Sequence, residues 1–300
     1  MSTGEANGKV ILFGEHFVVH GAPAIACGIS SGVFVELKKS DQNRIVTKHK
    51  VVEKLSLDGI ERVFAVMGVH EKYDVRLTGD LRTYGGLGSS AAFCVALVKA
   101  VAKEKDLHLT KEQINKYAYA GEGAFHGNPS GIDNTIATHG GVVEFRRGKT
   151  PEENKFDFIE LYKPLDIVIS FSGRYSQTAK MVERVKDFKS QDEEEFAQLL
   201  DEYIDIVSKG RAALEKGQID VIGKLMNANQ SLVSELGLSD EGNDAINDIA
   251  IAKGALGAKL TGGGGGGCCI ALAKDENHAK EIEKKIKEKG FDSFATRISN

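Results

Sequence analysis

The sequence predicts a protein of mixed α and β structure in two parts, and three observations support this prediction. Strand-like and helix-like segments alternate along its 300 residues. The glycine run Gly85–Gly88 is followed at once by small, apolar residues with helical spacing. Helical patterns dominate after residue 160, whereas the earlier part is mixed and rich in glycine. We therefore expect two domains, at residues 1–160 and 161–300.

The composition is that of an ordinary globular protein, with 41% hydrophobic and 27% charged residues, which excludes disordered, collagen-like and disulfide-scaffold classes. The 39 basic and 43 acidic residues nearly balance, so charge gives no reason to expect a nucleic acid or a membrane as partner. There is no signal peptide and no apolar window long enough to span a membrane, so we expect a cytoplasmic protein. The cysteines lie in apolar or small-residue runs and are expected to be buried and free: Cys27, Cys94, Cys268 and Cys269.

In the first part, four segments have the pattern of short strands: Val10–Phe13, Val33–Leu37, Val75–Thr78 and Val142–Phe145. A buried helix is expected from Ser89 to Lys103. A second helix begins at Thr110, where Thr110-x-x-Gln113 is a capping box. Residues 44–57 are ambiguous, and residues 126–134 are expected to form a loop.

In the second part, helices are expected at 176–188, 193–216, 218–236, 240–253 and 276–289, the last of them highly charged. Strands are expected at Leu165–Phe171 and Cys268–Ala273, with Phe291–Ile298 as an edge strand. The six glycines Gly262–Gly267 stand between an apolar helix and an apolar strand, where a flexible linker would have no use.

The first glycine run suggests a phosphate-binding loop. Its backbone N–H groups can converge on an anion, and the start of the following helix adds partial positive charge. The two serines offer hydroxyls to a phosphate or to Mg²⁺. The loop residues are Gly85, Gly86, Leu87, Gly88, Ser89 and Ser90.

Two other nucleotide-binding patterns compete for this chain. Gly86–Ala91 has the spacing of a dinucleotide-binding loop, and Asp106 lies about 20 residues further on. Against this reading, residues 93–105 form one helical segment, so the second strand that should present the acid is missing. A Walker A loop is disfavoured because Val143 stands where Gly148–Thr150 would require a glycine.

Two further groups have residue types suited to phosphoryl chemistry. Lys9 precedes the first apolar strand, and Glu15 and His16 follow that strand. Glu122 and Asp133 stand 11 residues apart, and paired carboxylates beside a phosphate loop suggest one metal ligand and one base. Taken alone, each of these residues could equally be a solvated surface group.

Four segments, in order, resemble the signature motifs of the GHMP kinase superfamily, and within it those of the mevalonate kinases: Gly8–Gly21, Gly86–Ala92, His126–Asn134 and Lys259–Leu272. The resemblance covers nearly the whole chain. It implies an α+β, two-domain GHMP kinase fold. The N-terminal domain would contain a left-handed βαβ crossover, and the C-terminal domain would be ferredoxin-like with added helices.

The resemblance also implies ATP-dependent phosphorylation of the C5 hydroxyl of mevalonate, with Mg²⁺ as cofactor. Asp133 would accept the hydroxyl proton, and Lys9 would bind ATP and stabilise the transferring phosphate. Ser90 and Glu122 would hold Mg²⁺, and the loop 85–90 would bind the ATP phosphates. The residues implied at the mevalonate side are Glu15, His16, Thr178, Gly262, Gly263, Gly264 and Gly265. For Glu15, a substrate contact and a structural role both remain open.

Two positions depart from the family pattern. The family has a proline near the position of Thr83, and Gly263 replaces a common alanine. We expect neither change to touch a group with chemistry, and the extra glycine to cost about 0.5–1 kcal/mol. The resemblance also implies a homodimer. The alternatives are another GHMP-family kinase, such as a phosphomevalonate kinase, a catalytically silent ATP-binding regulator, and a nicotinamide-dependent enzyme.

Overall fold

A computed structural model describes residues 1–47, 53–82, 85–126, 129–150 and 153–300. The chain forms two compact units. The first comprises Met1–Lys9, Gly28–Thr83 and Leu87–Gly140, and the second Val10–Cys27, Tyr84–Gly86 and Gly141–Asn300. The second unit thus includes two whole segments from before residue 160, and its third segment also begins before that residue, at Gly141. The predicted domain boundary at that residue stays a prediction.

The strands of the first unit belong to β1 (Ser2–Phe13), β2 (Ala24–Ser40), β3 (Arg44–Val46) and β4 (Lys72–Gly79). Within this unit β2 pairs antiparallel with β4, and β3 pairs with β4 in parallel. β1 pairs with β2. The helix α1 (Glu53–Val66) connects β3 to β4. Only its start, residues 53–57, lies in the stretch 44–57 that the sequence pattern left ambiguous.

The strand predicted at Val10–Phe13 was too short, because β1 begins at Ser2. The buried face of this early part consists of Ser2, Gly4, Ala6 and Gly8, which carry little apolar signal. A Cβ at Gly4 would lie 2.1 Å from the backbone oxygen of Ala96, so the small residues let a helix pack against the strand. The prediction for β2 was likewise too short.

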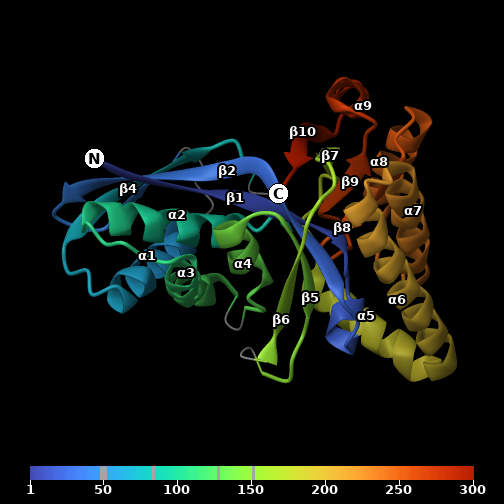
Figure 1. The fold of residues 1–300 in the computed structure, drawn as a ribbon, viewed down its shortest axis with the longest axis horizontal. Coiled ribbons are helices and arrows are strands. Elements are labelled where there is room, and N and C mark those ends of the chain that lie inside the picture. Colours follow the sequence, from blue (N-terminus) through green and yellow to red (C-terminus); the bar gives the residue numbers. More distant parts are fainter. Residues whose placement is uncertain (48–52, 83–84, 127–128, 151–152) are drawn as a thin grey trace. The chain divides into compact units, whose positions relative to one another are not determined.

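Three more helices complete the first unit: α2 (Ser89–Glu104), α3 (Lys111–His126) and α4 (Ile132–His139). α1 to α4 pack against one another on one side of β1, β2 and β4 (Figure 1). The predicted capping box is confirmed, because Thr110 and Gln113 each accept the other's backbone N–H. The loop predicted at 126–134 was wrong at its end, where α4 begins at Ile132. Residues 127–128 lie outside the described residues.

In the second unit, β5 (Val142–Arg146) pairs with β6 (Lys155–Ile159) and with residues 24–27 of β2. A separate antiparallel sheet has the order β10-β7-β9-β8. Its strands are β7 (Leu165–Phe171), β8 (Gly257–Thr261), β9 (Cys268–Leu272) and β10 (Asp292–Ile298). Helices follow β7 and β9, so the element sequence is the βαββαβ of a ferredoxin-like domain. This confirms the predicted C-terminal fold, with β10 at an edge. β8 was not predicted.

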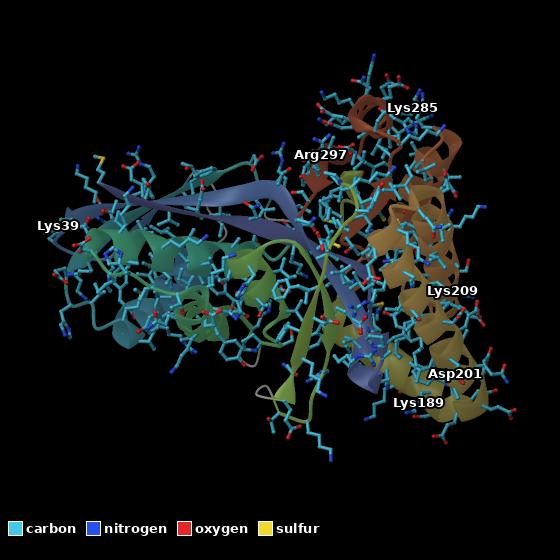
Figure 2. The ribbon with its side chains drawn as sticks, viewed as in Figure 1. Lys39, Lys189, Asp201, Lys209, Lys285 and Arg297 are labelled. Atoms are coloured by element: carbon cyan, nitrogen blue, oxygen red, sulfur yellow. The ribbon has the colours of Figure 1, made fainter. Side chains whose placement is uncertain are left out.

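The helices of this unit match the predicted segments to within a few residues: α5 (Thr178–Gln191), α6 (Glu193–Lys216), α7 (Ile219–Glu235), α8 (Glu241–Ala252) and α9 (Glu276–Glu288). α7 and α8 contact β8, and α9 contacts β7 and β10. Charged side chains such as Asp201 and Lys209 project from α6 (Figure 2). All four cysteines are buried and free, as predicted. Among the described residues, no helix is long and apolar enough to cross a membrane.

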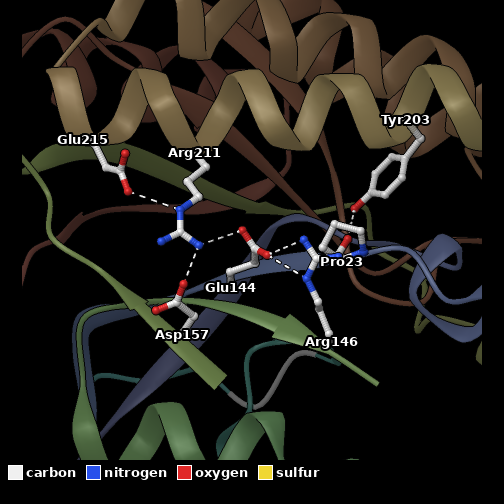
Figure 3. A network of polar contacts seen from close by, with 7 residues as sticks. All are labelled: Pro23, Glu144, Arg146, Asp157, Tyr203, Arg211 and Glu215. Atoms are coloured by element: carbon white, nitrogen blue, oxygen red, sulfur yellow. Dashed lines mark hydrogen bonds and ion pairs between the residues drawn. The ribbon is translucent and has the colours of Figure 1, made fainter. Parts of the chain in front are cut away.

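An ionic network joins α6 to the β5–β6 hairpin (Figure 3). Arg211 Nη1 donates to Glu144 Oε2 at 3.0 Å and to Asp157 Oδ2 at 2.6 Å. The other oxygen of Glu144 accepts from Arg146 at 3.0 Å. Glu144 is buried, so two arginines compensate the charge that this strand carries inward.

Candidate active site

Lys9 and Asp133 form an ion pair in the first unit. The distance from Lys9 Nζ to Asp133 Oδ1 is 3.1 Å. The lysine side chain is 7% exposed, whereas the aspartate side chain is 29% exposed. A cation held in a largely dry place beside a reachable carboxylate is suited to stabilise negative charge that develops next to that carboxylate.

The start of α4 positions Asp133. Gly131 caps the helix with φ 83°, a left-handed conformation that favours glycine. Asp133 lies in the first helical turn, where the helix dipole stabilises its negative charge. The next residue, Asn134, donates to Asn115 Oδ1 of α3 at 2.5 Å, which ties this turn to the neighbouring helix.

Ser90 and Glu122 also meet in the first unit. Ser90 Oγ donates to Glu122 Oε1 at 2.7 Å, and His126 Nε2 lies 3.3 Å from the same carboxylate oxygen. Glu122 is buried, and its Oε2 makes no hydrogen bond to any part of the chain that the structure describes. Burial, together with the charge of Asp133, raises the pKa of Glu122 to about 7, although the bond from Ser90 opposes the shift. A cation is the natural partner for this carboxylate.

A pocket of about 280 Å³ opens beside these groups. Its lining residues are Glu122, His126, Pro129, Ser130, Gly131, Asp133 and Asn134. Sequence reasoning placed Glu122 and Asp133 in one site, and the pocket contains both. It did not single out His126 for a role, although that residue opens the motif His126–Asn134.

The loop 85–90, which the sequence predicts to bind phosphate, leads directly into α2, as expected. Gly88 is the N-cap of α2 with φ 67°, and Ser89 and Ser90 are the first residues of the helix. Lys9 N donates to the carbonyl of Leu87 at 2.9 Å. A Cβ at Gly88 would lie 2.9 Å from Lys9 Cγ. Gly88 is therefore required both by its conformation and by the close passage of the lysine.

Gly85 and Gly86 belong to the second unit, where Gly86 meets the third motif. A Cβ on Gly86 would lie 3.4 Å from the backbone oxygen of Thr261, and φ at Gly86 is 98°. Around Gly85, no atom of the described chain lies within 4 Å of such a Cβ. The position near Thr83, where the family has a proline, lies outside the described residues.

His16 lies in the second unit against the glycine run. Its Nε2 is 2.9 Å from the carbonyl oxygen of Gly263. A carbonyl only accepts, so Nε2 carries the proton. Burial lowers the pKa of His16, which favours the neutral ring. Its Nδ1 is then a hydrogen-bond acceptor.

Thr178 belongs to a short chain of hydroxyl groups. Ser176 Oγ donates to the carbonyl of Gly264 at 2.7 Å and lies 3.2 Å from Thr178 Oγ1. Because the serine proton is already used, the threonine donates to the serine and keeps its own lone pairs free to accept. Sequence reasoning named Thr178 and missed Ser176, two residues before it.

Gly263 lies against the hydroxyls of Thr178 and Ser176, and the expectation that it touches no group with chemistry stays a prediction. A Cβ at this position would lie 2.1 Å from Thr178 Oγ1 and 2.5 Å from Ser176 Oγ. The backbone of Gly263 does not require glycine, because its φ is not among the positive values. What requires glycine here is the space that the two hydroxyls occupy.

Glu15 is paired with a residue that sequence reasoning did not single out. Its Oε1 accepts from Lys259 Nζ at 2.5 Å, and both side chains are 0% exposed. Its position fits the structural role that the sequence left open. In the sequence, Lys259 is followed by Leu260, Thr261 and the glycine run, and nothing there indicates that this lysine is buried.

Both parts of the chain match family models. The model for the GHMP kinases N terminal domain matches residues 51–141, and that for GHMP kinases C terminal matches residues 211–292. The mevalonate kinase of Pyrococcus abyssi is 33% identical over 98% of this chain and 94% of its own length. The crystal structure of L. major mevalonate kinase in complex with R-mevalonate has a TM-score of 0.91 at 34% identity. That alignment covers 100% of this chain and 96% of the L. major chain.

The Methanococcus jannaschii mevalonate kinase has a TM-score of 0.84 at 26% identity and covers 99% of this chain and 98% of its own. The N-terminal family model matches the first part of the chain and the C-terminal model the second part, in the expected order. The alignments with the relatives cover nearly the whole chain. The chain belongs to the GHMP kinases, in their mevalonate kinase family.

Proposed function

We propose that this chain transfers the γ-phosphoryl group of ATP to the C5 hydroxyl of mevalonate, giving 5-phosphomevalonate. The relatives that support the substrate are mevalonate kinases, one of them solved with R-mevalonate. The observation that carries the chemistry is the Lys9–Asp133 pair at the first turn of α4.

Asp133 orients the acceptor hydroxyl and accepts its proton. An ordinary aspartate is a weak base, so its main contribution is to hold the hydroxyl in line and to take the proton late in the reaction. Lys9 stabilises the charge on the transferring phosphoryl group. This division suits phosphoryl transfer, which depends on positioning and charge neutralisation more than on covalent help.

The loop 85–90 and the start of α2 bind the ATP phosphates. Gly88 has no side chain to cap the first backbone N–H groups of α2, and the described residues show no side-chain cap bond at this N-cap. Unpaired N–H groups at a helix start bind anions. Ser89 and Ser90 add hydroxyls at the same end.

The residues fit a Mg²⁺ ion. Ser90 and Glu122 would hold it, since Glu122 has a buried oxygen that makes no hydrogen bond within the described part of the chain. When bound, the ion would neutralise phosphate charge. Mg²⁺ usually takes one or two carboxylates and completes its shell with phosphates and water. Accordingly, the described residues contain no group of three or more His, Cys, Asp or Glu side chains that could hold a metal.

A direct test of the Mg²⁺ ligands is the Glu122→Gln variant. It keeps the size of the side chain and removes its charge. We expect the Mg²⁺ concentration for half-maximal activity to rise by about 10–100-fold. An unchanged Mg²⁺ dependence would exclude Glu122 as a ligand.

The mevalonate side is assigned to His16, Thr178 and the glycines 262–265. His16 Nδ1 and Thr178 Oγ1 are both left as acceptors by the bonds described above, so they suit a hydroxyl-bearing substrate. We also propose that the enzyme acts in the cytoplasm and that it is a homodimer. Light scattering of the purified protein would test the dimer through its molar mass.

The experiment that tests the function is an ADP-coupled assay with Mg-ATP and four acceptors: mevalonate, phosphomevalonate, galactose and homoserine. We expect turnover with mevalonate alone. Turnover with another acceptor alone would keep the kinase and overturn the roles of His16 and Thr178. ATP binding without any turnover would identify a silent regulator.

A further inference from the structure

The ion pair between Glu15 and Lys259 is enclosed in the second unit. Lys259 Nζ donates to Glu15 Oε1 at 2.5 Å and to the carbonyl of Leu260 at 2.6 Å. Both side chains are 0% exposed. Glu15 Oε2 is also buried and has no hydrogen-bond partner among the described residues.

Burying such a pair is a poor way to gain stability. The cost of removing two charges from water often exceeds their attraction, and apolar residues of similar size can do as well. A buried pair does fix direction, because each partner must face the other. The pair is therefore best understood from what it holds in place.

It holds the turn that carries His16. The φ of His16 is 60°, one of the few positive values at a residue other than glycine in the described chain. Such a conformation costs free energy and persists only where the surroundings enforce it. Glu15 immediately precedes His16 in the chain. The imidazole of His16 is hydrogen-bonded through Nε2 to the carbonyl oxygen of Gly263.

The strand β8 also binds the end of β1, which leads into this turn. Thr261 Oγ1 accepts from the backbone N–H of Ile11 at 3.0 Å and donates to the carbonyl of Ile11 at 2.9 Å. Lys259 and Thr261 are two residues apart, so they lie on one face of β8. The strand thus binds the chain before the turn, at Ile11, and within it, at Glu15.

We infer that Lys259 is a positioning residue, which acts through Glu15 to hold His16 in its positive-φ conformation against Gly263. This inference rests on the proposed function, in which His16 contacts mevalonate. It assigns Glu15 to the support of the site and not to the substrate. The lysine would set the geometry of the acceptor side from within the protein, since its side chain is fully buried.

The test compares a single, a double and a conservative variant. Lys259→Met leaves the Glu15 carboxylate buried without a partner, so we expect a lower Tm. The double variant Glu15→Leu/Lys259→Met removes both charges, and its Tm should return to within a few degrees of wild type. Its KM for mevalonate should still be about tenfold higher or more, because His16 is misplaced. Its KM for ATP should stay within about twofold.

Glu15→Gln is the conservative variant, since its amide oxygen still accepts from Lys259. We expect a near wild-type KM for mevalonate. A tenfold rise in this variant would show that the carboxylate itself binds substrate, and would overturn the inference. A double variant with the wild-type KM for mevalonate would also overturn it, because the pair would then be structural only. Should the double variant not fold, the KM of Lys259→Met for mevalonate takes its place, with the same expected rise and the same contradicting result.

A second readout does not depend on turnover. Long-range ¹H–¹⁵N spectra report which ring nitrogen of His16 carries the proton, and the His16→Asn variant assigns the signal. We expect the His16 signals to shift in the double variant and to stay unchanged in Glu15→Gln. Unshifted His16 signals in the double variant would contradict the inference, whatever the activity of the wild type. A wild type that is inactive on mevalonate would contradict only the proposed function.

The matched control is Lys209→Met. Lys209 pairs with Asp205 at the same 2.5 Å, but the two side chains are exposed on α6 (Figure 2). An exposed pair of this kind contributes little to stability. This variant should leave the Tm, both KM values and the His16 signals as in wild type.

Discussion

The glycine at position 263 offers a sharp test of the acceptor side. Gly263→Ala adds one methyl group at a point where a Cβ would lie 2.1 Å from Thr178 Oγ1 and 2.5 Å from Ser176 Oγ. Thr178 Oγ1 would have to retreat by about 1.4 Å to reach an ordinary contact of about 3.5 Å. Such a displacement breaks the bond between Ser176 and Thr178, and strains the bond from Ser176 to Gly264.

The magnitude follows from the hydrogen bonds at risk. Each neutral hydrogen bond contributes about 0.5–1.5 kcal/mol, and about 1.4 kcal/mol corresponds to tenfold in an equilibrium constant. We expect the KM for mevalonate to rise about three- to tenfold. The Tm should change by only a few degrees, because alanine at this non-left-handed position regains about 0.4–1 kcal/mol through the unfolded chain.

The assay is steady-state kinetics of Gly263→Ala, of Thr178→Val, and of the double variant. Because the methyl group acts through the Thr178 hydroxyl, we expect the two effects not to add. The double variant should resemble Thr178→Val. The reasoning is refuted if Gly263→Ala keeps the wild-type KM for mevalonate, or if the two losses add in full.

Three other predictions follow from the geometry. Asp133→Ala should lose about 10²–10⁴ in kcat while ATP still binds, as isothermal calorimetry would show; full activity would exclude Asp133 as the proton acceptor. Burial lowers the pKa of His16, so the unfolded chain binds a proton below pH 6.5 that the folded chain resists. The free energy of unfolding should therefore fall as pH drops through that value, by at most about 1.4 kcal/mol per pH unit. Burial also lowers the pKa of His20 and His139, so urea titrations should show a fall in both proteins, and a steeper one in wild type than in His16→Asn. Equal slopes would contradict the assignment. Arg211→Leu leaves the buried Glu144 with one arginine (Figure 3), so about 1–3 kcal/mol of stability should be lost. An unchanged urea midpoint would show that the network contributes nothing.

The sequence predicted elements well where burial follows a clear period. The helices α6 to α8 alternate apolar and polar faces over several turns, and their predicted ranges differ little from the observed ones. The first half of β1 was missed because glycine, alanine and serine form its buried face. α4 was missed in part because it is short and begins directly after Gly131.

In the site, residues within local sequence motifs could be predicted, whereas a residue whose partner is distant in sequence could not. Lys9, Ser90 and Asp133 stand in recognisable motifs, and Glu122 was singled out because it lies 11 residues before Asp133. The structure brings the four together in the first unit, Lys9 with Asp133 and Ser90 with Glu122. Lys259 could not be identified in this way. Its partner Glu15 is 244 residues away in sequence, and a lysine beside apolar residues gives no sign of a buried charge until that partner is located.

The central claim is that this chain phosphorylates mevalonate on its C5 oxygen. The most direct measurement is a phosphorus NMR spectrum of the product formed from mevalonate and Mg-ATP. C5 is a methylene and C3 carries no hydrogen, so only a phosphate on the C5 oxygen shows three-bond coupling to methylene protons. We expect one phosphomonoester signal with that coupling. A product signal without the coupling, or no product while ATP is bound, would contradict the account.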